Sequence, residues 1–279
     1  MPQKNGSKVN GRRPLTRDDH KYSRGTVAIV AGSKRYPGAA VLTVGGARRG
    51  GVGYVKYLDK NSEVTALVLA QFPDVVPIAN LHDERVDALV VGPGATTIRT
   101  LPEKIPVVLD SGALSLARES QTKRVPSQII VVTPHEGELT SLGFSINRET
   151  FSGSATSLNN ELGIKNSRRQ SSRVETAQNI ANQLNVVVVL KGYRTVIAAP
   201  HLKHVIDTLG GPELAVAGSG DILAGLIGAF LASWKPENLQ EAQHTVSAAV
   251  RLHSQAGKHA SQTHSTVVAT DILESLAHC

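Results

Sequence analysis

The stretch that decides the fold is TVAIVAGSKRYPGAAVLTVGGARRGGVGYVKYL, residues 26–58. An apolar run, Thr26–Ala31, leads through a short loop, Gly32–Pro37, into a helix of small residues predicted over Gly38–Arg49. A second apolar run, Tyr54–Leu58, follows that helix. Val/Ile/Leu runs that alternate with helical stretches are typical of buried, mostly parallel strands.

The same alternation continues along the chain. Further strands are predicted at Asp87–Val91, Pro106–Asp110, Ile129–Thr133 and Val186–Leu190, with a late antiparallel meander at Thr195–Ala199 and His204–Asp207. Helices are predicted at Ala113–Glu119, Glu136–Leu142, Val174–Leu184, Gly218–Ala232, Glu237–Ala260 and Asp271–Ala277. The sequence therefore predicts an α/β fold, a three-layer α/β/α domain with a mostly parallel central sheet.

We expect this domain to occupy residues 25–279, after a flexible, polar and basic segment over residues 1–24. Residues 144–173 are rich in Ser, Asn, Arg and Lys without clear periodicity, so they are predicted to be a mobile insertion with little regular structure. The N-terminal segment lacks the apolar stretch of a secretory signal, and no apolar run reaches membrane-spanning length. Cys279 is the single cysteine, which fits a reducing cytoplasm and excludes an intrachain disulfide.

The formal net charge of the chain is +7, which has two interpretations. Either the charge comes from a basic tail on an otherwise ordinary surface, or it serves to attract polyanionic small molecules such as nucleotides. The basic residues are scattered and no nucleic-acid-binding motif accompanies them, so we expect no nucleic-acid partner.

The strongest local feature is Gly218-Ser219-Gly220-Asp221 at the start of the apolar helix. A helix N-terminus presents free N–H groups and a positive dipole end that suit phosphate, and glycines let the backbone approach a ligand closely. Asp221, placed beside a phosphoryl group, can accept a proton from an attacking hydroxyl. Taken alone, however, these residues are more often a glycine-rich helix start with an ordinary first-turn carboxylate.

A second feature, Leu190–Thr195, places Lys191 at the carboxyl end of a buried strand, where ligands of open α/β sheets bind. Lys191 can hold a phosphate there, and Thr195 can offer a hydroxyl or a backbone group. The other interpretation is a surface lysine in a turn between two strands.

Three further segments also follow predicted strands. His135 in TPHEGE can hydrogen-bond a substrate, although a lone histidine in a loop is more often just a polar residue on the surface. Glu136 and Glu138 suit the first turn of a helix. Residues 92–94, Gly-Pro-Gly, form a turn, and residues 32–40 bring backbone close to a ligand or pack a helix on the sheet. A GxGxxG dinucleotide fingerprint, a Walker A sequence, an HExxH motif and a nucleophile elbow are all absent from the sequence.

Taken together and in order, these segments resemble the ADP-dependent NAD(P)H-hydrate dehydratase family, a branch of the ribokinase-like superfamily. The resemblance runs from about Gly25 to Leu276. Its matching segments are VAIVAGSKRYPGAAVLTVGGARRGGVGYV, VVGPGATT, VVLDSGALSL, VVTPHEGEL, VVVVLKGYRTVIAAP and GPELAVAGSGDILAGLIGAFLA. It implies a stand-alone lyase of nicotinamide nucleotide repair, which returns the S form of hydrated NADH or NADPH to NADH or NADPH and releases AMP and phosphate.

The resemblance also implies roles for matching positions. Residues implied to bind the hydrated dinucleotide are Ala40, Gly94, His135 and Asp221, with Asp221 also the catalytic residue. Residues implied to bind the nucleotide are Lys191, Gly192, Tyr193, Arg194, Thr195, Gly218, Ser219 and Gly220. Mg²⁺ is the implied cofactor, without assigned protein ligands, and ADP is the implied phosphoryl donor, with ATP as the other candidate. A cytoplasmic homotetramer is expected.

One departure from the family pattern lies in LDSGAL, residues 109–114, because the family often has LDADAL there. The carboxylate at Gly112 is missing, which puts any metal or substrate contact from it in doubt. Two alternative functions remain at this point. One is a ribokinase-like vitamin kinase for hydroxymethylpyrimidine, hydroxyethylthiazole or pyridoxal, which would release a phosphorylated product. The other is a non-catalytic nucleotide-binding regulator, which would not need Asp221.

Overall fold

The computed structural model describes residues 11–279 except 59, 83, 95–97, 99, 122–124, 126 and 147–157. Its strands are β1 (Thr26–Val30), β2 (Tyr54–Leu58), β3 (Val76–Ile78), β4 (Ala88–Val91), β5 (Val107–Leu109), β6 (Ile130–Val132), β7 (Val187–Leu190), β8 (Val196–Ala198) and β9 (Val205–Ile206). Its α-helices are α1 (Pro37–Arg49), α2 (Ser62–Gln71), α3 (Leu116–Glu119), α4 (Leu158–Leu184), α5 (Ser219–Trp234), α6 (Leu239–Thr263) and α7 (Ala269–Ser275). Short 3₁₀ helices are η1 (Ser111–Ala113), η2 (Glu136–Leu142) and η3 (Pro212–Leu214).

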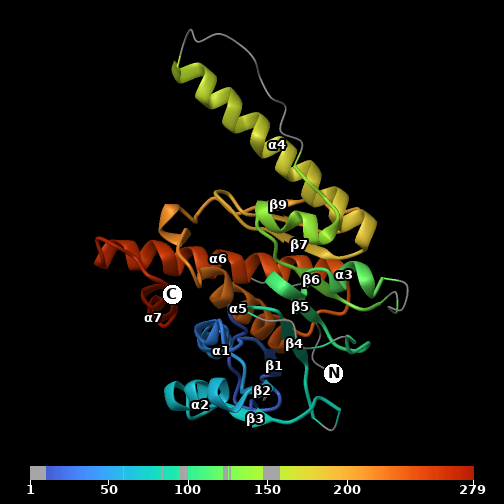
Figure 1. The fold of residues 1–279 in the computed structure, drawn as a ribbon, viewed down its shortest axis with the longest axis vertical. Helices are drawn as coiled ribbons and strands as arrows, with labels where there is room; N and C mark the ends of the chain where they lie inside the picture. The colour runs from blue at the N-terminus through green and yellow to red at the C-terminus, as the bar shows by residue number, and fades with distance from the viewer. Residues whose placement is uncertain are drawn as a thin grey trace.

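The strands form one sheet in the order β3-β2-β1-β4-β5-β6-β7-β8-β9 (Figure 1). Strands β1 to β7 pair in parallel, whereas β8 and β9 add two antiparallel pairings at one edge. The prediction of a mostly parallel sheet with a late antiparallel meander is therefore confirmed.

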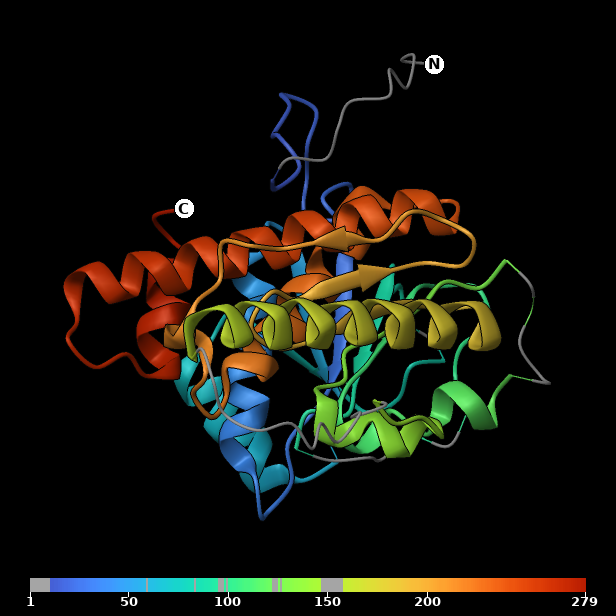
Figure 2. The same ribbon diagram turned by 90° about the horizontal axis from the view of Figure 1, so that it is seen from above.

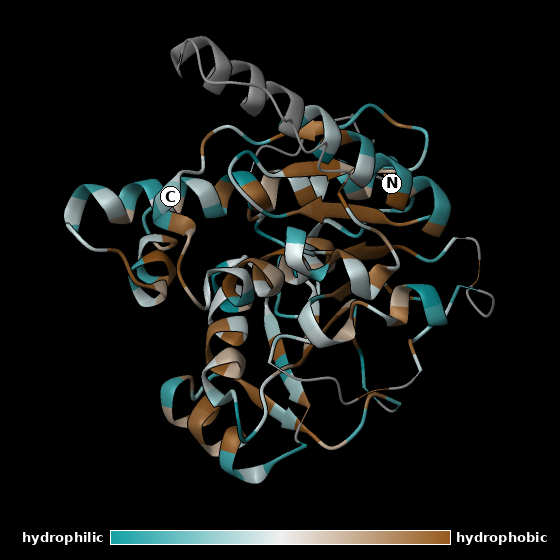
Figure 3. Ribbon diagram, turned by 45° about the horizontal axis from the view of Figure 1, so that its top comes forward, coloured by the Kyte–Doolittle hydropathy of each residue, from teal (hydrophilic) through white to brown (hydrophobic). Residues whose placement is uncertain are grey.

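Helices cover both faces of this sheet, as the view in Figure 2 shows. Alternate side chains of a strand point to opposite faces. Accordingly, Val27 and Ile29 pack in one cluster with α1, α5 and α6, while Ala28 and Val30 pack in another with α3, η2 and α4. Because both faces are buried, the central strands are hydrophobic along their length (Figure 3).

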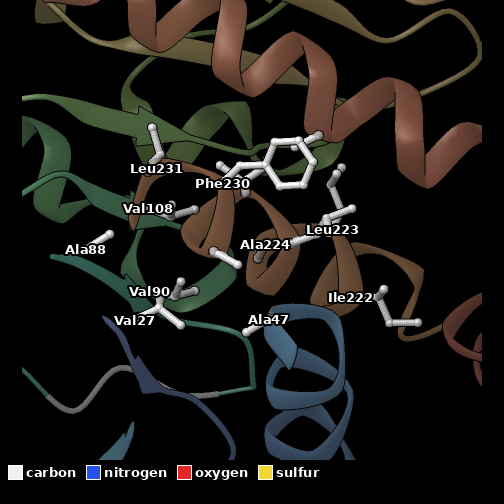
Figure 4. Packing of buried hydrophobic residues seen from close by; sticks show 14 of the residues in the cluster. Val27, Ala47, Ala88, Val90, Val108, Ile222, Leu223, Ala224, Phe230 and Leu231 are labelled. Atoms are coloured by element: carbon white, nitrogen blue, oxygen red, sulfur yellow. The ribbon is translucent and has the colours of Figure 1, made fainter. Parts of the chain in front are cut away.

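Helix α5 is the buried helix that carries the candidate site at its first turn. It lies against the sheet at Gly228, where a β-carbon would meet Val90 and Val27. Leu223 and Phe230 of the same helix belong to the buried cluster drawn in Figure 4. Apolar residues lie on every side of α5, which agrees with its burial between the sheet and α6.

Glycines bring α1 and α5 into direct backbone contact. A β-carbon at Gly46 would collide with the carbonyl oxygen of Ile222, and one at Gly225 would collide with that of Thr43. Close approach of the two helices therefore requires these glycines, which explains the small-residue helix that follows β1.

Two expectations need correction. Residues 158–173 are part of helix α4, so the prediction of little regular structure is wrong for this part of the 144–173 segment. Residues 147–157 of the segment lie outside the described residues. Half of residues 158–173 are Leu, Glu, Lys, Arg or Gln, which favour helix even where apolar residues show no period. The described part of the N-terminal segment is also packed. The Arg12 side chain donates to the carbonyls of Arg49 and Cys279, and Trp234 Nε1 donates to that of Gly11. These contacts tie Gly11 and Arg12 to the domain.

Candidate active site

Three neighbouring parallel strands end in polar residues at the same edge of the sheet. Asp110 directly follows β5, Thr133 directly follows β6 and Lys191 directly follows β7. The backbone N–H of Lys191 donates to the Pro134 carbonyl, which aligns this position with the start of the His135 segment. The carboxyl ends of parallel strands are where open α/β sheets bind ligands.

Lys191 lies at the centre of this polar edge. Its Nζ donates a 2.8 Å hydrogen bond to Asp110 Oδ1 and lies 3.8 Å from Glu138 Oε2. A β-carbon built on Gly220 would stand 3.2 Å from the same Nζ, so the lysine reaches the first turn of α5. Burial lowers the pKa of Lys191, but the carboxylates of Asp110, Glu138 and Asp221 outweigh it and raise that pKa. The Lys191 side chain is therefore positively charged at neutral pH and is held in place by these carboxylates.

Asp110 anchors the lysine from beneath. It is 2% exposed, and its Oδ1 accepts a 2.6 Å hydrogen bond from Thr133 Oγ1 in addition to the bond from Lys191. The Gly92 backbone lies against the carbonyl of Asp110, so residues 92–94 border the same position.

Asp221 occupies the first turn of α5. Burial, together with the carboxylates of Asp110 and Glu138, raises its pKa to about 7, although Lys191 acts in the opposite direction. A carboxyl group that is half ionised near pH 7 suits proton acceptance during catalysis.

The start of α5 is set by backbone geometry and one buried side-chain contact. Gly218 has φ +91°, and a β-carbon there would collide with Leu42 of α1. Ser219 is buried, and its Oγ lies 3.2 Å from Nε2 of His253 on α6. Complete burial lowers the pKa of His253 to about 4, which keeps the ring neutral. The Ser219 hydroxyl therefore faces the core, and only its backbone remains available to a phosphate.

The loop that follows Lys191 has an irregular backbone. Gly192 has φ +149° and Arg194 has φ +61°. Thr195 Oγ1 donates 3.2 Å to the Gly192 carbonyl, while the Tyr193 side chain extends from the loop and is 73% exposed. These residues follow Lys191 directly, and their contact with a nucleotide stays a prediction.

His135 begins η2 and is turned toward its own helix. Its Nδ1 accepts a 2.9 Å hydrogen bond from the Gly137 N–H, and its Nε2 lies 3.6 Å from Glu138 Oε2. The ring is largely exposed, so it can reach a ligand on the Glu138 side of Lys191.

Gly94 and Ala40 lie on the other side of Asp110. Ser33 Oγ donates a 2.8 Å hydrogen bond to the Gly94 carbonyl, and Gly32 N–H donates to Pro93. Gly94 is in the left-handed region at φ +68°. Ala40 is wholly buried beneath Gly32, so its contact with a substrate stays a prediction.

The structure also adds residues that sequence reasoning missed. Asp110 was not predicted as a site residue, because only the carboxylate that is absent at Gly112 was considered. Asp110 nevertheless ends a predicted strand at the same edge of the sheet as Lys191. Glu138 was treated only as a first-turn charge. His253 and Arg173 have no local signal, because their partners are distant in the sequence.

The described residues contain no group of three or more His, Cys, Asp or Glu side chains placed to hold a metal ion. None of the described helices combines the length and the apolar character that a membrane-spanning helix requires.

Comparisons with known proteins agree on one family. Residues 27–278 match a family model described as NAD(P)H-hydrate dehydratase. The chain is 37% identical to the bifunctional NAD(P)H-hydrate repair enzyme of Corynebacterium glutamicum, over 77% of this chain and 37% of that protein. It is 30% identical to the ADP-dependent (S)-NAD(P)H-hydrate dehydratase of Lactococcus lactis, over 84% of this chain and 82% of that protein.

A solved structure shows the same fold. It is an ADP/ATP-dependent NAD(P)H-hydrate dehydratase from Bacillus subtilis co-crystallised with ATP and Mg²⁺, with a TM-score of 0.73 and 28% identity, covering 97% of this chain and 94% of that one. The chain spans between 37% and 50% of the length of several bifunctional relatives.

Proposed function

The chain belongs to the NAD(P)H-hydrate dehydratase family, and we propose that it restores the S form of hydrated NADH and NADPH to NADH and NADPH at the expense of ADP. The observation that carries this proposal is the position of Asp221. Its pKa is raised to about 7 at the first turn of α5, beside the cation of Lys191. A base next to a phosphate-binding helix end is the arrangement that phosphoryl transfer to a hydroxyl needs.

The proposed reaction has two parts. Asp221 accepts the proton of the hydroxyl beside the ring nitrogen while that oxygen bonds to the terminal phosphorus, and the bond from this phosphorus to the oxygen of AMP breaks. The ring nitrogen then contributes its lone pair, the carbon–oxygen bond breaks and phosphate leaves. Loss of a proton from the ring restores the dihydronicotinamide. Phosphate replaces hydroxide as the leaving group, which is the chemical reason for using a nucleotide.

The residues around Asp221 stabilise the charge that moves during transfer. The positive end of the α5 dipole and the backbone of Gly218–Asp221 face the transferring phosphoryl group. Lys191 balances part of the negative charge of the donor from the β7 side. In this proposal residues 192–195 bind the nucleotide phosphates, and Gly94 and His135 bind the hydrated dinucleotide.

Mg²⁺ fits this site as a partner of the nucleotide. It usually keeps several waters and binds through substrate phosphates with one or two carboxylates, so a cluster of three protein ligands is not required. Glu138, whose Oε2 lies 3.8 Å from Lys191 Nζ, is the carboxylate that would hold the ion. When bound, the ion neutralises phosphate charge.

We also propose a homotetramer and a cytoplasmic location, both of which rest on the family. The single cysteine, Cys279, is a free thiol, which fits a reducing compartment. Light scattering of the purified protein tests the assembly, because a tetramer has four times the 29.5 kDa mass of the chain.

The experiment that tests the function follows the near-ultraviolet absorbance of NADH. Purified protein is mixed with hydrated NADH and magnesium, with ADP, with ATP or without nucleotide. Absorbance that returns only with a nucleotide, together with equal release of phosphate, supports the dehydratase and identifies the donor. A protein that binds nucleotide but restores no NADH contradicts it, and vitamin-kinase substrates are then assayed for phosphorylated products.

A further inference from the structure

The loop after Lys191 is held by a buried guanidinium from α4. Arg173 is 3% exposed. Its Nη1 donates 2.9 Å hydrogen bonds to the carbonyls of Tyr193 and Arg194, and its Nη2 donates to those of Leu190 at 3.0 Å and Lys191 at 3.1 Å. One side chain therefore binds four main-chain carbonyls on both sides of Gly192.

The same guanidinium also contacts the segment that begins at His135. Arg173 Nε lies 3.1 Å from Glu136 Oε1, in the first turn of η2. Arg173 thus joins two loops, one assigned to the nucleotide and the other to the hydrated dinucleotide. Its charge is balanced by Glu136, so the buried cation is paired as burial requires.

The loop conformation depends on contacts of this kind. A β-carbon on Gly192 would lie 2.8 Å from Arg173 Nη2, and the φ of +149° is one that favours glycine. Arg194 has a left-handed backbone, which is unfavourable for a non-glycine residue. A backbone that is unfavourable by itself persists only where its surroundings hold it.

Arg173 bears directly on the position of Lys191. The Lys191 carbonyl accepts from Arg173, while its Nζ donates to Asp110. These bonds fix both ends of the lysine, and with them its approach to Gly220 and Asp221.

We propose that Arg173 is a positioning residue that holds the 190–194 loop and Lys191 in the nucleotide-binding geometry. This inference rests on the proposed function for the identity of the ligands. Arg173 is buried behind the loop, so it acts through the backbone. A guanidinium presents five donors in a fixed plane, whereas a lysine ammonium cannot reach four carbonyls in that arrangement.

The test compares Arg173→Gln and Arg173→Lys with the wild type. Gln178→Ala is the matched control, because Gln178 lies on the same helix and donates to the Ala199 carbonyl, outside the loop. Amide hydrogen exchange of peptides covering residues 190–195 is measured without ligand. Calorimetric binding of ADP with Mg²⁺ and the two Michaelis constants are measured on the same proteins.

We expect both Arg173 variants to exchange the loop amides at least about tenfold faster and to bind ADP at least about tenfold more weakly. The KM for hydrated NADH should change by less than about threefold, and Gln178→Ala should resemble the wild type in every readout. A folded Arg173 variant with unchanged loop exchange and unchanged ADP binding overturns the proposal. If Arg173→Gln fails to fold, Arg173→Lys, which keeps the charge beside Glu136, decides it.

The two proposals fail separately. A wild type that never restores NADH contradicts the dehydratase, whereas loop exchange and ADP binding still decide the role of Arg173. If in Arg173→Lys the ADP affinity falls and the KM for the dinucleotide rises by the same factor, the residue acts on the fold as a whole and the positioning role is wrong.

Discussion

Lys191 Nζ donates a 2.8 Å hydrogen bond to Asp110 Oδ1, across the ends of two strands separated in the sheet by β6. Glu138 and Asp221 raise the pKa of the same lysine, so three carboxylates surround one cation. A site with this charge balance does not attract phosphate by itself. It becomes favourable for a nucleotide when Asp221 is protonated or when a divalent cation accompanies the phosphates.

Asp221→Asn is expected to abolish dehydration while leaving ADP binding within about threefold, because the amide cannot accept the hydroxyl proton. The same variant should be more stable than the wild type above pH 7. The pKa of Asp221 rises from 3.8 unfolded to about 7 folded, so stability is lost as pH rises through this window. Partial exposure reduces the full linkage value, and we expect a gain of about 2 kcal/mol at pH 8.

Urea unfolding at pH 4 and pH 8 checks this stability effect, since the difference between the two proteins should be small at pH 4. Equal loss of turnover and ADP binding in Asp221→Asn would instead indicate a structural role for the carboxylate.

The pH dependence of kcat/KM should show an acid limb near pH 7. Asp221 must be ionised to act as a base, so activity rises with pH through the pKa of about 7. Asp110→Asn removes a carboxylate that raises this pKa and frees Lys191 from its 2.8 Å partner. Both changes favour ionised Asp221, so the limb should move to lower pH. A limb that stays in place or moves upward in Asp110→Asn would show that another group controls it.

Removal of Mg²⁺ should weaken ADP binding by at least about tenfold, because the phosphates would otherwise meet three carboxylates and one lysine. Calorimetry with Mg²⁺ and with excess chelator measures this difference. The comparison is made in Asp221→Asn as well, which cannot turn over. The same ADP affinity with and without Mg²⁺ would contradict the proposed charge balance.

Apolar runs located most strands to within one or two residues, because strands buried on both faces are hydrophobic along their length. Helix α2 and strand β3 were missed. The N-cap of α2 was a usable signal, since Asn61 Oδ1 accepts from the N–H groups of Glu63 and Val64. The extent of α4 was missed because its first half carries no apolar period.

The site was predictable where a strand end or a helix start marks it in the sequence. Lys191 and Asp221 stand at such positions. Asp110 was within reach of the same reasoning, because it ends a predicted strand. Arg173 and His253 were not, since their roles arise from packing of α4 and α6 against segments far away in the sequence.

Gly225→Ala should destabilise the fold, because the new β-carbon would collide with the Thr43 carbonyl where α1 and α5 touch. Overpacking of this kind costs about 1–3 kcal/mol. Gly38→Ala is the matched control, since nothing lies within 4 Å of a β-carbon at that position in α1. Alanine there should stabilise by about 0.5–1 kcal/mol. Thermal unfolding of both variants measures the contrast, and an equal shift in the two would contradict the close packing of the helices.

His253→Gln should make the protein more resistant to acid. The pKa of His253 falls from 6.5 to about 4 on folding, so the unfolded chain binds the proton first and stability is lost as pH falls through this window. The loss for this group amounts to about 3 kcal/mol at pH 4. Glutamine does not titrate and can still hydrogen-bond Ser219 Oγ, so the free energy of unfolding of the variant should fall less steeply from pH 6.5 to pH 4. Parallel pH profiles for variant and wild type would show that His253 is not the group that weakens the fold in acid.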